Sequence, residues 1–420
     1  MGRGPLFVYR CAVHLVLPLL APFLWIADRR SGKRRPPLRH RLALGLPALP
    51  QGGIVVHAVS VGEVMVARLL LRELRHRLPN IPLLLTATTA TGLRLASGAL
   101  MADATVPFPL DLPGPVRRFL AATKPRLLVL VETELWPEIL AACSAQGIPV
   151  VLINARISDR SFGRYRRLKQ LLTTLLEPIT LGLAQSPQDA ERLVAIGIPA
   201  GKVRVTGNIK FDAVPPGQIN ADLRAALMTL ARGRAIVVAG STMPEEEKEV
   251  LKAVAPLRHQ VFLLLAPRHP ERTREVLELC QDAGLSSLRR SLLSSTKAPA
   301  DVVVVDTVGE LAALYQLGQV AFVGGSLVPT GGHNPIEPAL FGVPVLTGPH
   351  VHNFASVYQE LISKGGAFMV HDSQELGQSL RFFLQHPDYA QAAGEAAKAV
   401  LVANTGATVR TVQALETLLA

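Results

Sequence analysis

Cysteine is scarce in this chain, and its pattern excludes two classes of protein. Only Cys11, Cys143 and Cys280 occur among the 420 residues. Because they are odd in number and far apart, they form neither a disulfide framework nor a metal-binding motif. A reducing, cytoplasmic setting is therefore expected.

Aromatic residues are also few, at 5% of the chain, which bears on the excess of positive charge. The formal net charge is +12, and between Met1 and Pro50 nine Lys/Arg residues accompany one acidic residue, Asp28. Basic arms of this kind bind nucleic acid or an anionic membrane surface. No nucleic-acid recognition motif and no interleaved aromatics accompany this one, so we expect no nucleic acid partner and favour the membrane.

A long apolar run, Leu6–Ala27, precedes most of these arginines. It is long enough to cross a bilayer, but it contains an arginine, a histidine and two prolines. A cleaved signal peptide is the alternative, yet the run ends in Asp28 and two arginines rather than in small residues. We expect residues 1–50 to anchor the protein, either spanning the bilayer or lying on it, with the rest of the chain on the cytoplasmic side.

The remainder of the chain alternates between buried strands and amphipathic helices. The first pair is the apolar run Ile54–Ser60, followed by residues 63–78 with apolar side chains at helical spacing. Later apolar runs also break into polar residues at their carboxyl ends. This pattern predicts parallel sheets with polar clusters along one edge.

The periodicity lapses once, around Val205–Gln218, where glycine, proline and polar residues predict a linker. The pattern then restarts. We therefore predict an α/β protein of two Rossmann-like domains, residues 51–210 and 211–420, which face each other across a cleft.

A Gly-rich stretch in the second half, residues 331–337, precedes a helical pattern that begins with two prolines. Glycines at a helix amino terminus allow a phosphate to approach unpaired N–H groups, and Glu337 would accept hydrogen bonds from ribose hydroxyls. The alternative is a tight turn with Asn334 as an ordinary helix cap.

Six motifs together resemble the 3-deoxy-D-manno-octulosonic acid (Kdo) transferases. In chain order they are "HAVSVGE" (57–63), "VETELWP" (131–137), "INARISDRSFGRY" (153–165), "APRHPER" (266–272), "DTVGEL" (306–311) and "GGHNPIEPA" (331–339). The resemblance implies a GT-B glycosyltransferase fold with CMP-Kdo as donor and a lipid A precursor as acceptor. It also implies an enzyme of lipopolysaccharide biosynthesis at the cytoplasmic face of the inner membrane. It further implies transfer without a metal or other cofactor, and no Asp-x-Asp motif lies at a predicted strand end.

The resemblance assigns Glu63 as the catalytic base, at a strand-to-helix turn after Gly62. A glutamate stabilised by the helix dipole is the alternative, and the dipole would lower its pKa unless the cleft is partly desolvated. Glu132 and Glu134 flank Thr133 at a strand end and would point the same way if the strand continues. One of them is expected to shape the acceptor site.

Basic residues follow in the stretch 154–169, where six of them accompany Asp159. A solvated helix face is the ordinary explanation. Beside a lipid site, the same charges would hold lipid A phosphates or the donor carboxylate, with Arg156 the favoured member because it directly follows a strand.

Nucleotide-binding residues are predicted at strand ends of the second domain, where Arg268 would offset charge on the leaving CMP. The structural alternative is equally open for His269. The predicted set is Arg268, His269, Glu310, Gly324, Gly325, Ser326, His333, Asn334 and Glu337.

Two other functions remain open for this fold. A sugar-nucleotide 2-epimerase would need no lipid-facing amino-terminal segment, and a non-catalytic nucleotide-sugar sensor would not need Glu63 opposite Glu132 and Glu134. The sequence leaves open how many Kdo residues are transferred.

Overall fold

The computed structural model describes residues 4–13, 15, 36–98, 102–212, 217–295 and 298–419. The chain divides into two compact units, one formed by Met1–Ala213 with Thr405–Ala420 and the other by Val214–Asn404. The first unit gives way to the second after Ala213, close to the predicted boundary after residue 210. The predicted second domain differs at its end, because the last residues return to the first unit.

The first unit contains a parallel seven-stranded sheet in the order β3-β2-β1-β4-β5-β6-β7. Its strands are β1 (Ile54–Ala58), β2 (Leu83–Ala87), β3 (Ala104–Pro107), β4 (Leu127–Val131), β5 (Val150–Ala155), β6 (Ile179–Ala184) and β7 (Val203–Val205). Its helices include α2 (Leu38–Arg41), α3 (Val61–Arg77), α4 (Ala90–Ser97), α5 (Pro113–Thr123), α6 (Pro137–Ala145), α7 (Asp159–Arg167), α8 (Lys169–Leu176), α9 (Pro187–Ala195) and α18 (Ala407–Glu416).

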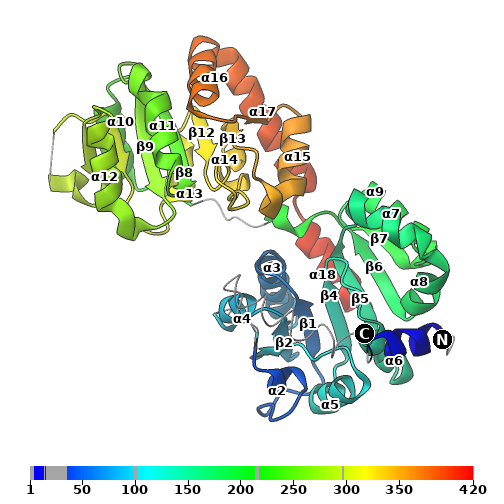
Figure 1. Ribbon diagram of the computed structural model, residues 1–420. Coiled ribbons are helices and arrows are strands. Elements are labelled where there is room, and N and C mark those ends of the chain that lie inside the picture. Colours follow the sequence, from blue (N-terminus) through cyan, green and yellow to red (C-terminus); the bar gives the residue numbers. More distant parts are fainter. Residues whose placement is uncertain are drawn as a thin grey trace. The chain divides into compact units, whose positions relative to one another are not determined.

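Central strands of this sheet are buried along their whole length, as expected when helices cover both faces. Helices α3, α4 and α18 pack on one face, and α5, α6, α8 and α9 pack on the other (Figure 1). The helical spacing noted in the sequence is confirmed in α3, where Val66, Leu70 and Leu74 are fully buried against the sheet.

The second unit contains another parallel seven-stranded sheet, in the order β10-β11-β9-β8-β12-β13-β14. Its strands are β8 (Ala235–Thr242), β9 (Val261–Pro267), β10 (Ser287–Arg289), β11 (Val302–Val304), β12 (Val320–Val323), β13 (Val345–Thr347) and β14 (Ala367–Met369). Its helices are α10 (Ala221–Ala231), α11 (Glu246–Val254), α12 (Thr273–Asp282), α13 (Leu311–Leu314), α14 (Ile336–Leu340), α15 (Ala355–Ser363), α16 (Ser373–Gln385) and α17 (Pro387–Asn404). Hydrophobic cores again lie on both faces of the sheet.

Helix α18 brings the end of the chain back to the first unit, where it packs beside α3 (Figure 1). Asp212 holds the start of this helix, because its carboxylate accepts hydrogen bonds from the amides of Gly406 and Thr408 at 2.7 and 2.6 Å. Arg410 adds a bond to the carbonyl of Thr206 at 2.9 Å. These contacts join segments about 200 residues apart in sequence, which local periodicity does not encode.

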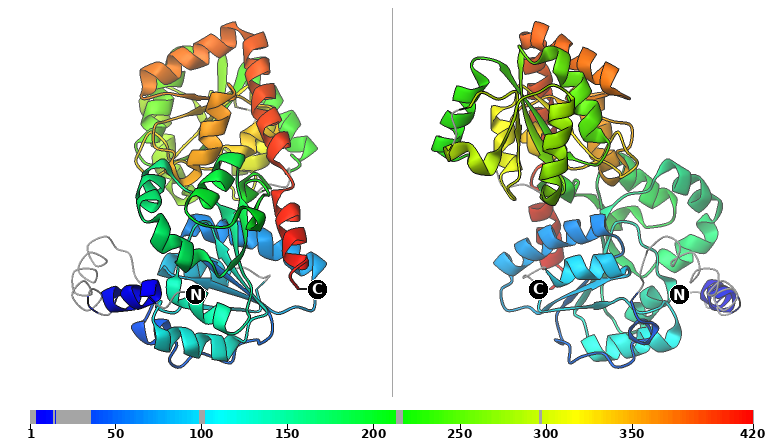
Figure 2. Two further views of the ribbon diagram at one scale, coloured as in Figure 1. Left: turned by 90° about the vertical axis from the view of Figure 1, so that its right-hand side faces the viewer. Right: turned by 60° about the vertical axis from the view of Figure 1, so that its left-hand side comes forward.

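Residues 4–13 form a helix that lies against the first unit (dark blue in Figure 2). The Tyr9 hydroxyl donates to Asp111 at 2.7 Å, and the Arg10 guanidinium makes two 2.8 Å bonds to the carboxylate of Glu138. Asp111 also accepts the amides of Glu138 and Ile139, so it caps the start of α6. The first helix is therefore tied to the end of α6 that follows the Glu132–Trp136 loop.

Part of the predicted anchor, including residues 16–27 and the basic residues at 29–35, lies outside the described residues. Within the described part of the chain, no helix has both the length and the apolar character needed to cross a membrane. Arg41, one of the basic residues of this segment, is half-buried. Burial lowers the pKa of the His57 imidazole, and the charge of Arg41 lowers it slightly further.

Candidate active site

The strand order of the first unit leaves a crevice at the carboxyl edge of its sheet. The chain leaves β1 for β2 on one side and later enters β4 on the other side of β1. Loops that follow β1 and β4 therefore diverge, and a switch point of this kind is the usual ligand site of an open α/β sheet. Glu63 follows β1, while Glu132 and Glu134 follow β4.

Glu63 stands in the first turn of α3 and closes a capping box with Ser60. Its carboxylate accepts the Val59 amide at 2.8 Å and the Ser60 hydroxyl at 2.7 Å, and the residue is only 6% exposed. Burial raises the pKa of Glu63, and the charge of Glu132 raises it further, while the bonds from Val59 and Ser60 oppose the shift. Glu63 is thus a helix-capping carboxylate whose burial outweighs the opposing effect of its hydrogen-bond donors on its pKa.

Glu132 and Glu134 come close to Glu63, although not for the reason that the sequence suggested. Strand β4 ends at Val131, and Glu132 adopts a left-handed conformation with φ of 60°, so the strand does not continue. The pKa of Glu134 is raised to about 7, mainly by burial and then by the charges of Glu63 and Glu132. The three carboxyl groups therefore interact as one cluster at the switch point.

Lys210 is a member of this site that sequence reasoning missed. Its ammonium group lies 3.2 Å from a carboxylate oxygen of Glu132, and its side chain is 14% exposed. Asn154, at the end of β5, accepts the amide of Ile209 at 2.9 Å and so fixes the turn that carries the lysine. The only available signal was a lysine among polar residues in "GNIKFD", a stretch that the lapse in periodicity assigned to a linker.

Arg156 joins the same edge through its backbone. The Thr133 hydroxyl donates to the carbonyl of Arg156 at 2.6 Å and accepts its amide at 3.1 Å, which links the loops after β4 and β5. The side chain of Arg156 is half-buried. The basic residues of α7 and α8, by contrast, are exposed as the solvated-face interpretation expects; they include Arg164, Arg166, Arg167 and Lys169.

In the second unit, Arg268 and His333 lie close to Glu337. The positive charge of Arg268 lowers the pKa of His333, after the larger effect of burial, and brings it to about 4. The same guanidinium opposes the effect of burial, which raises the pKa of Glu337. His333 is therefore neutral at pH 7, and its Nε2 atom has no hydrogen-bond partner among the described residues.

Asn334 forms the tight turn that the sequence offered as an alternative, but the cap residue of α14 is Pro335 and not Asn334. Its side-chain oxygen accepts the Ile336 amide at 3.1 Å, and its amide group donates to Glu337 at 3.4 Å. The remaining acceptor positions of the Glu337 carboxylate are available to a ligand.

The Gly324–Ser326 loop, which belongs to the predicted nucleotide-binding set, uses its polar groups for contacts within the second unit. The amides of Gly325 and Ser326 donate to the buried carboxylate of Glu246 at 2.6 and 2.8 Å. The Ser326 hydroxyl is also engaged, because it donates to the carbonyl of Val323 at 2.6 Å. These donors are occupied within the protein and do not face a ligand.

Two further predicted nucleotide-binding side chains have partners within the second unit. Glu310 accepts a hydrogen bond from Arg290 at 2.7 Å and another from the Thr307 hydroxyl. His269 is exposed and lies 3.3 Å from Glu271. Both residues lie at the carboxyl edge of the sheet, after β11 and β9 respectively.

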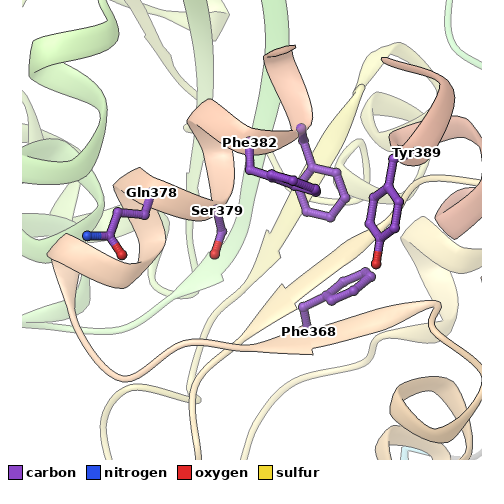
Figure 3. Close-up of a pocket in the computed structure, with 6 residues that line it drawn as sticks. Phe368, Gln378, Ser379, Phe382 and Tyr389 are labelled. Atoms are coloured by element: carbon purple, nitrogen blue, oxygen red, sulfur yellow. The ribbon is translucent and has the colours of Figure 1, made fainter. Parts of the chain in front are cut away.

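An aromatic pocket of about 280 Å³ lies elsewhere on the second unit. Phe368 of β14 and Phe382 of α16 both lie near Tyr389 of α17 (Figure 3), with ring centroids 6.1 and 5.2 Å from that of Tyr389. A second cavity, of about 330 Å³, is lined by residues such as Ala235 and Val320 at the amino ends of β8 and β12. Neither cavity includes a predicted site residue.

A metal-binding cluster of three or more His, Cys, Asp or Glu side chains was not found among the described residues.

Comparison with solved structures identifies the fold. UDP-GlcNAc 2-epimerase from Neisseria meningitidis, bound to UDP-GlcNAc, aligns with a TM-score of 0.55 at 15% sequence identity, covering 87% of this chain and all of that one. A likeness at this identity shows the fold alone, which is GT-B-like with two parallel-sheet α/β domains.

Comparison of sequences identifies the family. Residues 30–213 match the family model described as 3-deoxy-D-manno-octulosonic-acid transferase (kdotransferase). The chain is 37% identical to the 3-deoxy-D-manno-octulosonic acid transferase of Bordetella pertussis, over 99% of both chains, and 33% identical to that of Haemophilus influenzae, over 98% of both. With this similarity along nearly its whole length, the chain belongs to the 3-deoxy-D-manno-octulosonic acid transferase family.

Proposed function

We propose that this protein transfers Kdo from CMP-Kdo to a lipid A precursor, lipid IVA, with inversion and without a metal ion. The observation that carries the proposal is the buried Glu63 carboxylate, which lies beside Glu132 and Glu134 at the switch point of the first unit. Membership of the Kdo transferase family supplies the class of donor sugar.

Glu63 accepts the proton of the acceptor hydroxyl in this proposal. The hydroxyl oxygen forms a bond to the anomeric carbon of Kdo, and the bond from that carbon to the CMP phosphate breaks with its electron pair on the phosphate. A carboxylate with a raised pKa is a stronger base than an exposed one, so the burial of Glu63 favours this step.

Lys210 limits the electrostatic cost of this arrangement. Its ion pair with Glu132 offsets one of the negative charges that would otherwise hold a proton on Glu63. Glu134, whose pKa is about 7, is partly neutral at physiological pH, which further reduces repulsion within the cluster and leaves a carboxyl group able to donate a hydrogen bond to the acceptor.

Donor binding falls to the second unit. The exposed guanidinium of Arg268 offsets the charge that develops on the departing phosphate. The neutral imidazole of His333 offers the unpartnered Nε2 atom, and Glu337 accepts hydrogen bonds from ribose hydroxyls.

The proposed reaction is tested with CMP-Kdo labelled in the sugar, incubated with the protein in the presence and absence of lipid IVA. We expect label in the lipid only when both protein and acceptor are present. Conversion of the nucleotide sugar to an epimer without acceptor would favour the epimerase, and tight binding with no turnover would favour the sensor.

Replacing the base should abolish transfer while sparing the nucleotide site. We expect Glu63→Gln to reduce kcat by roughly a hundredfold or more, because the amide keeps the shape and does not accept the proton. Glu73→Gln is the matched control, since it removes a carboxylate of the same helix that pairs with Arg77 and leaves Glu63 and its donors in place. We expect this control to keep most of its activity; comparable activity losses in both variants would remove Glu63 from the chemistry.

The ribose contact is tested separately by titration calorimetry with CMP. Glu337→Ala should weaken CMP binding by roughly tenfold through lost hydrogen bonds. Its melting temperature should change little, because its carboxylate accepts only a 3.4 Å bond from Asn334 among the described contacts. Glu278→Ala removes an exposed glutamate from α12 of the same unit as a control for charge. Unchanged affinity in Glu337→Ala would show that the residue has a purely structural role.

We also propose that the amino-terminal segment attaches the enzyme to the cytoplasmic face of the inner membrane. An acceptor held in the bilayer by its acyl chains is reached only by an enzyme at that surface. Phe7, Val8 and Leu15 are exposed apolar side chains at the start of this segment. Apolar area and the following basic residues each contribute to attachment.

Deleting residues 1–27 should release much of the protein from anionic vesicles in a sedimentation assay. Neutralising the basic residues at 29–39 should loosen attachment mainly at low salt, because high salt already screens these exposed charges in the wild type. Arg41 is left unchanged because it is half-buried. Arg10→Gln breaks the ion pair with Glu138 without removing apolar area. Sedimentation of this variant therefore shows how much attachment depends on the contact between the amino-terminal helix and α6. Full sedimentation of the truncated protein at high salt would contradict the assignment.

A further inference from the structure

The second unit has its own switch point, between β8 and β12, and a protein side chain fills it. The chain leaves β8 for β9 on one side and later enters β12 on the other. Glu246, the first residue of α11, extends from the β8 side to the loop that follows β12 and is fully buried. Its carboxylate therefore occupies the position where open α/β sheets usually bind a ligand.

Four backbone amides donate to this carboxylate. One oxygen of Glu246 accepts Met243 at 2.9 Å and Gly325 at 2.6 Å, and the other accepts Ser326 at 2.8 Å and Leu327 at 2.7 Å. Three of these amides are consecutive in the chain and form a concave set of donors, which is the kind of site that binds phosphate in other proteins. Within the described part of the chain, Glu246 has no ion pair with a lysine, arginine or histidine, so the amides carry the stabilisation of its charge.

The same peptide groups hold the proposed nucleotide loop on their opposite side. The peptide plane between Gly324 and Gly325 donates its N–H to Glu246, and its carbonyl accepts the amide of His333 at 3.0 Å. The next plane donates the Ser326 N–H to Glu246, while its carbonyl accepts the amide of Gly332 at 2.6 Å. Because peptide groups are planar and rigid, a shift of the carboxylate is transmitted directly to His333.

Close steric contacts within the protein are enough to require glycine at positions 324 and 325. A Cβ atom at Gly324 would lie 2.9 Å from the Glu246 carboxylate and 2.6 Å from the carbonyl of Ser241. At Gly325, where φ is +69°, a Cβ atom would lie 2.7 Å from the His333 ring. The glycines thus allow the carboxylate and the imidazole to approach the loop.

We propose that Glu246 is an internal anion that positions the His333–Glu337 segment and keeps the nucleotide phosphate out of the amide nest. The phosphate is then bound outside the nest by side chains such as Arg268. This inference rests on the proposed nucleotide-binding function of the second unit. Glu246 is a positioning residue, because it contacts the loop and not the ligand.

The positioning role is tested by CMP titration of Glu246→Gln. The variant side chain has the same shape, but its amide group donates toward backbone N–H groups that also donate, so the loop must move. We expect CMP affinity to fall by roughly tenfold or more in the folded protein, measured well below the melting temperature. Wild-type affinity in Glu246→Gln would overturn the positioning role.

Glu247→Gln is the matched control. Glu247 is equally buried and adjacent, but it bonds to Arg272 and Thr242 rather than to the nest. We expect this variant to lose thermal stability and to keep CMP affinity within about threefold, since its contacts do not reach His333. An equal loss of CMP affinity in Glu246→Gln and Glu247→Gln would mean that general destabilisation causes the loss, and it would overturn the inference.

The exclusion role is tested with inorganic phosphate and does not depend on CMP. Glu246→Ala opens the nest, so phosphate should raise the melting temperature of this variant in a concentration-dependent way, compared with chloride at equal ionic strength. Wild type and Glu247→Ala should show a smaller phosphate-specific increase, because Glu246 still fills the nest in both proteins and phosphate binds only outside it. A Glu246→Ala protein that melts at the same temperature in both salts would overturn exclusion, whether or not the proposed donor is correct.

If Glu246→Ala does not fold, Glu246→Ser, which also empties the nest, replaces it in the phosphate series. The CMP titration of Glu246→Gln still decides the positioning role. If wild type does not bind CMP, the proposed function is contradicted. The phosphate series then still tests whether Glu246 excludes phosphate from the nest.

Discussion

Each unit depends on one topological constraint, which is that its first strand lies in the middle of a parallel sheet. The chain must leave β1 and β8 toward one side and return on the other, so a crevice opens at the carboxyl edge of each sheet. In both units a glutamate in the first turn of the next helix fills part of that crevice, Glu63 in one and Glu246 in the other. The helix dipole favours a negative charge at both positions.

The two glutamates have different chemistry because their surroundings differ. Glu246 accepts four backbone amides, which satisfy both of its oxygens. In the described part of the chain, Glu63 accepts hydrogen bonds only from Val59 and Ser60, which immediately precede its helix. Burial raises the pKa of Glu63, and the nearby charge of Glu132 raises it further. Filled acceptor positions weaken a carboxylate as a proton acceptor, whereas burial with fewer donors and a like charge nearby strengthens it.

The sequence predicted the parts of this structure that depend on local pattern. The alternation of strands and helices gave both parallel-sheet domains, and the position of Glu63 at a strand-to-helix turn is local as well. Lys210 and Glu246 act through partners 78 to 81 residues away, and α18 returns to a unit about 200 residues earlier, so periodicity contains no sign of them. The left-handed conformation of Glu132 was also missed, since it is rare outside glycine and asparagine.

The start of α6 connects the amino-terminal helix to the carboxylate cluster. Asp111 accepts the amides of Glu138 and Ile139 and the hydroxyl of Tyr9, while Glu138 pairs with Arg10. Glu134 lies only three residues before the first residue of α6. Glu138 is buried, so removing Arg10 would leave the Glu138 carboxylate without its ion-pair partner. The resulting destabilisation would affect the start of α6, which follows the proposed acceptor-site loop. The contacts of the amino-terminal helix therefore couple its position to that of the proposed acceptor-site loop.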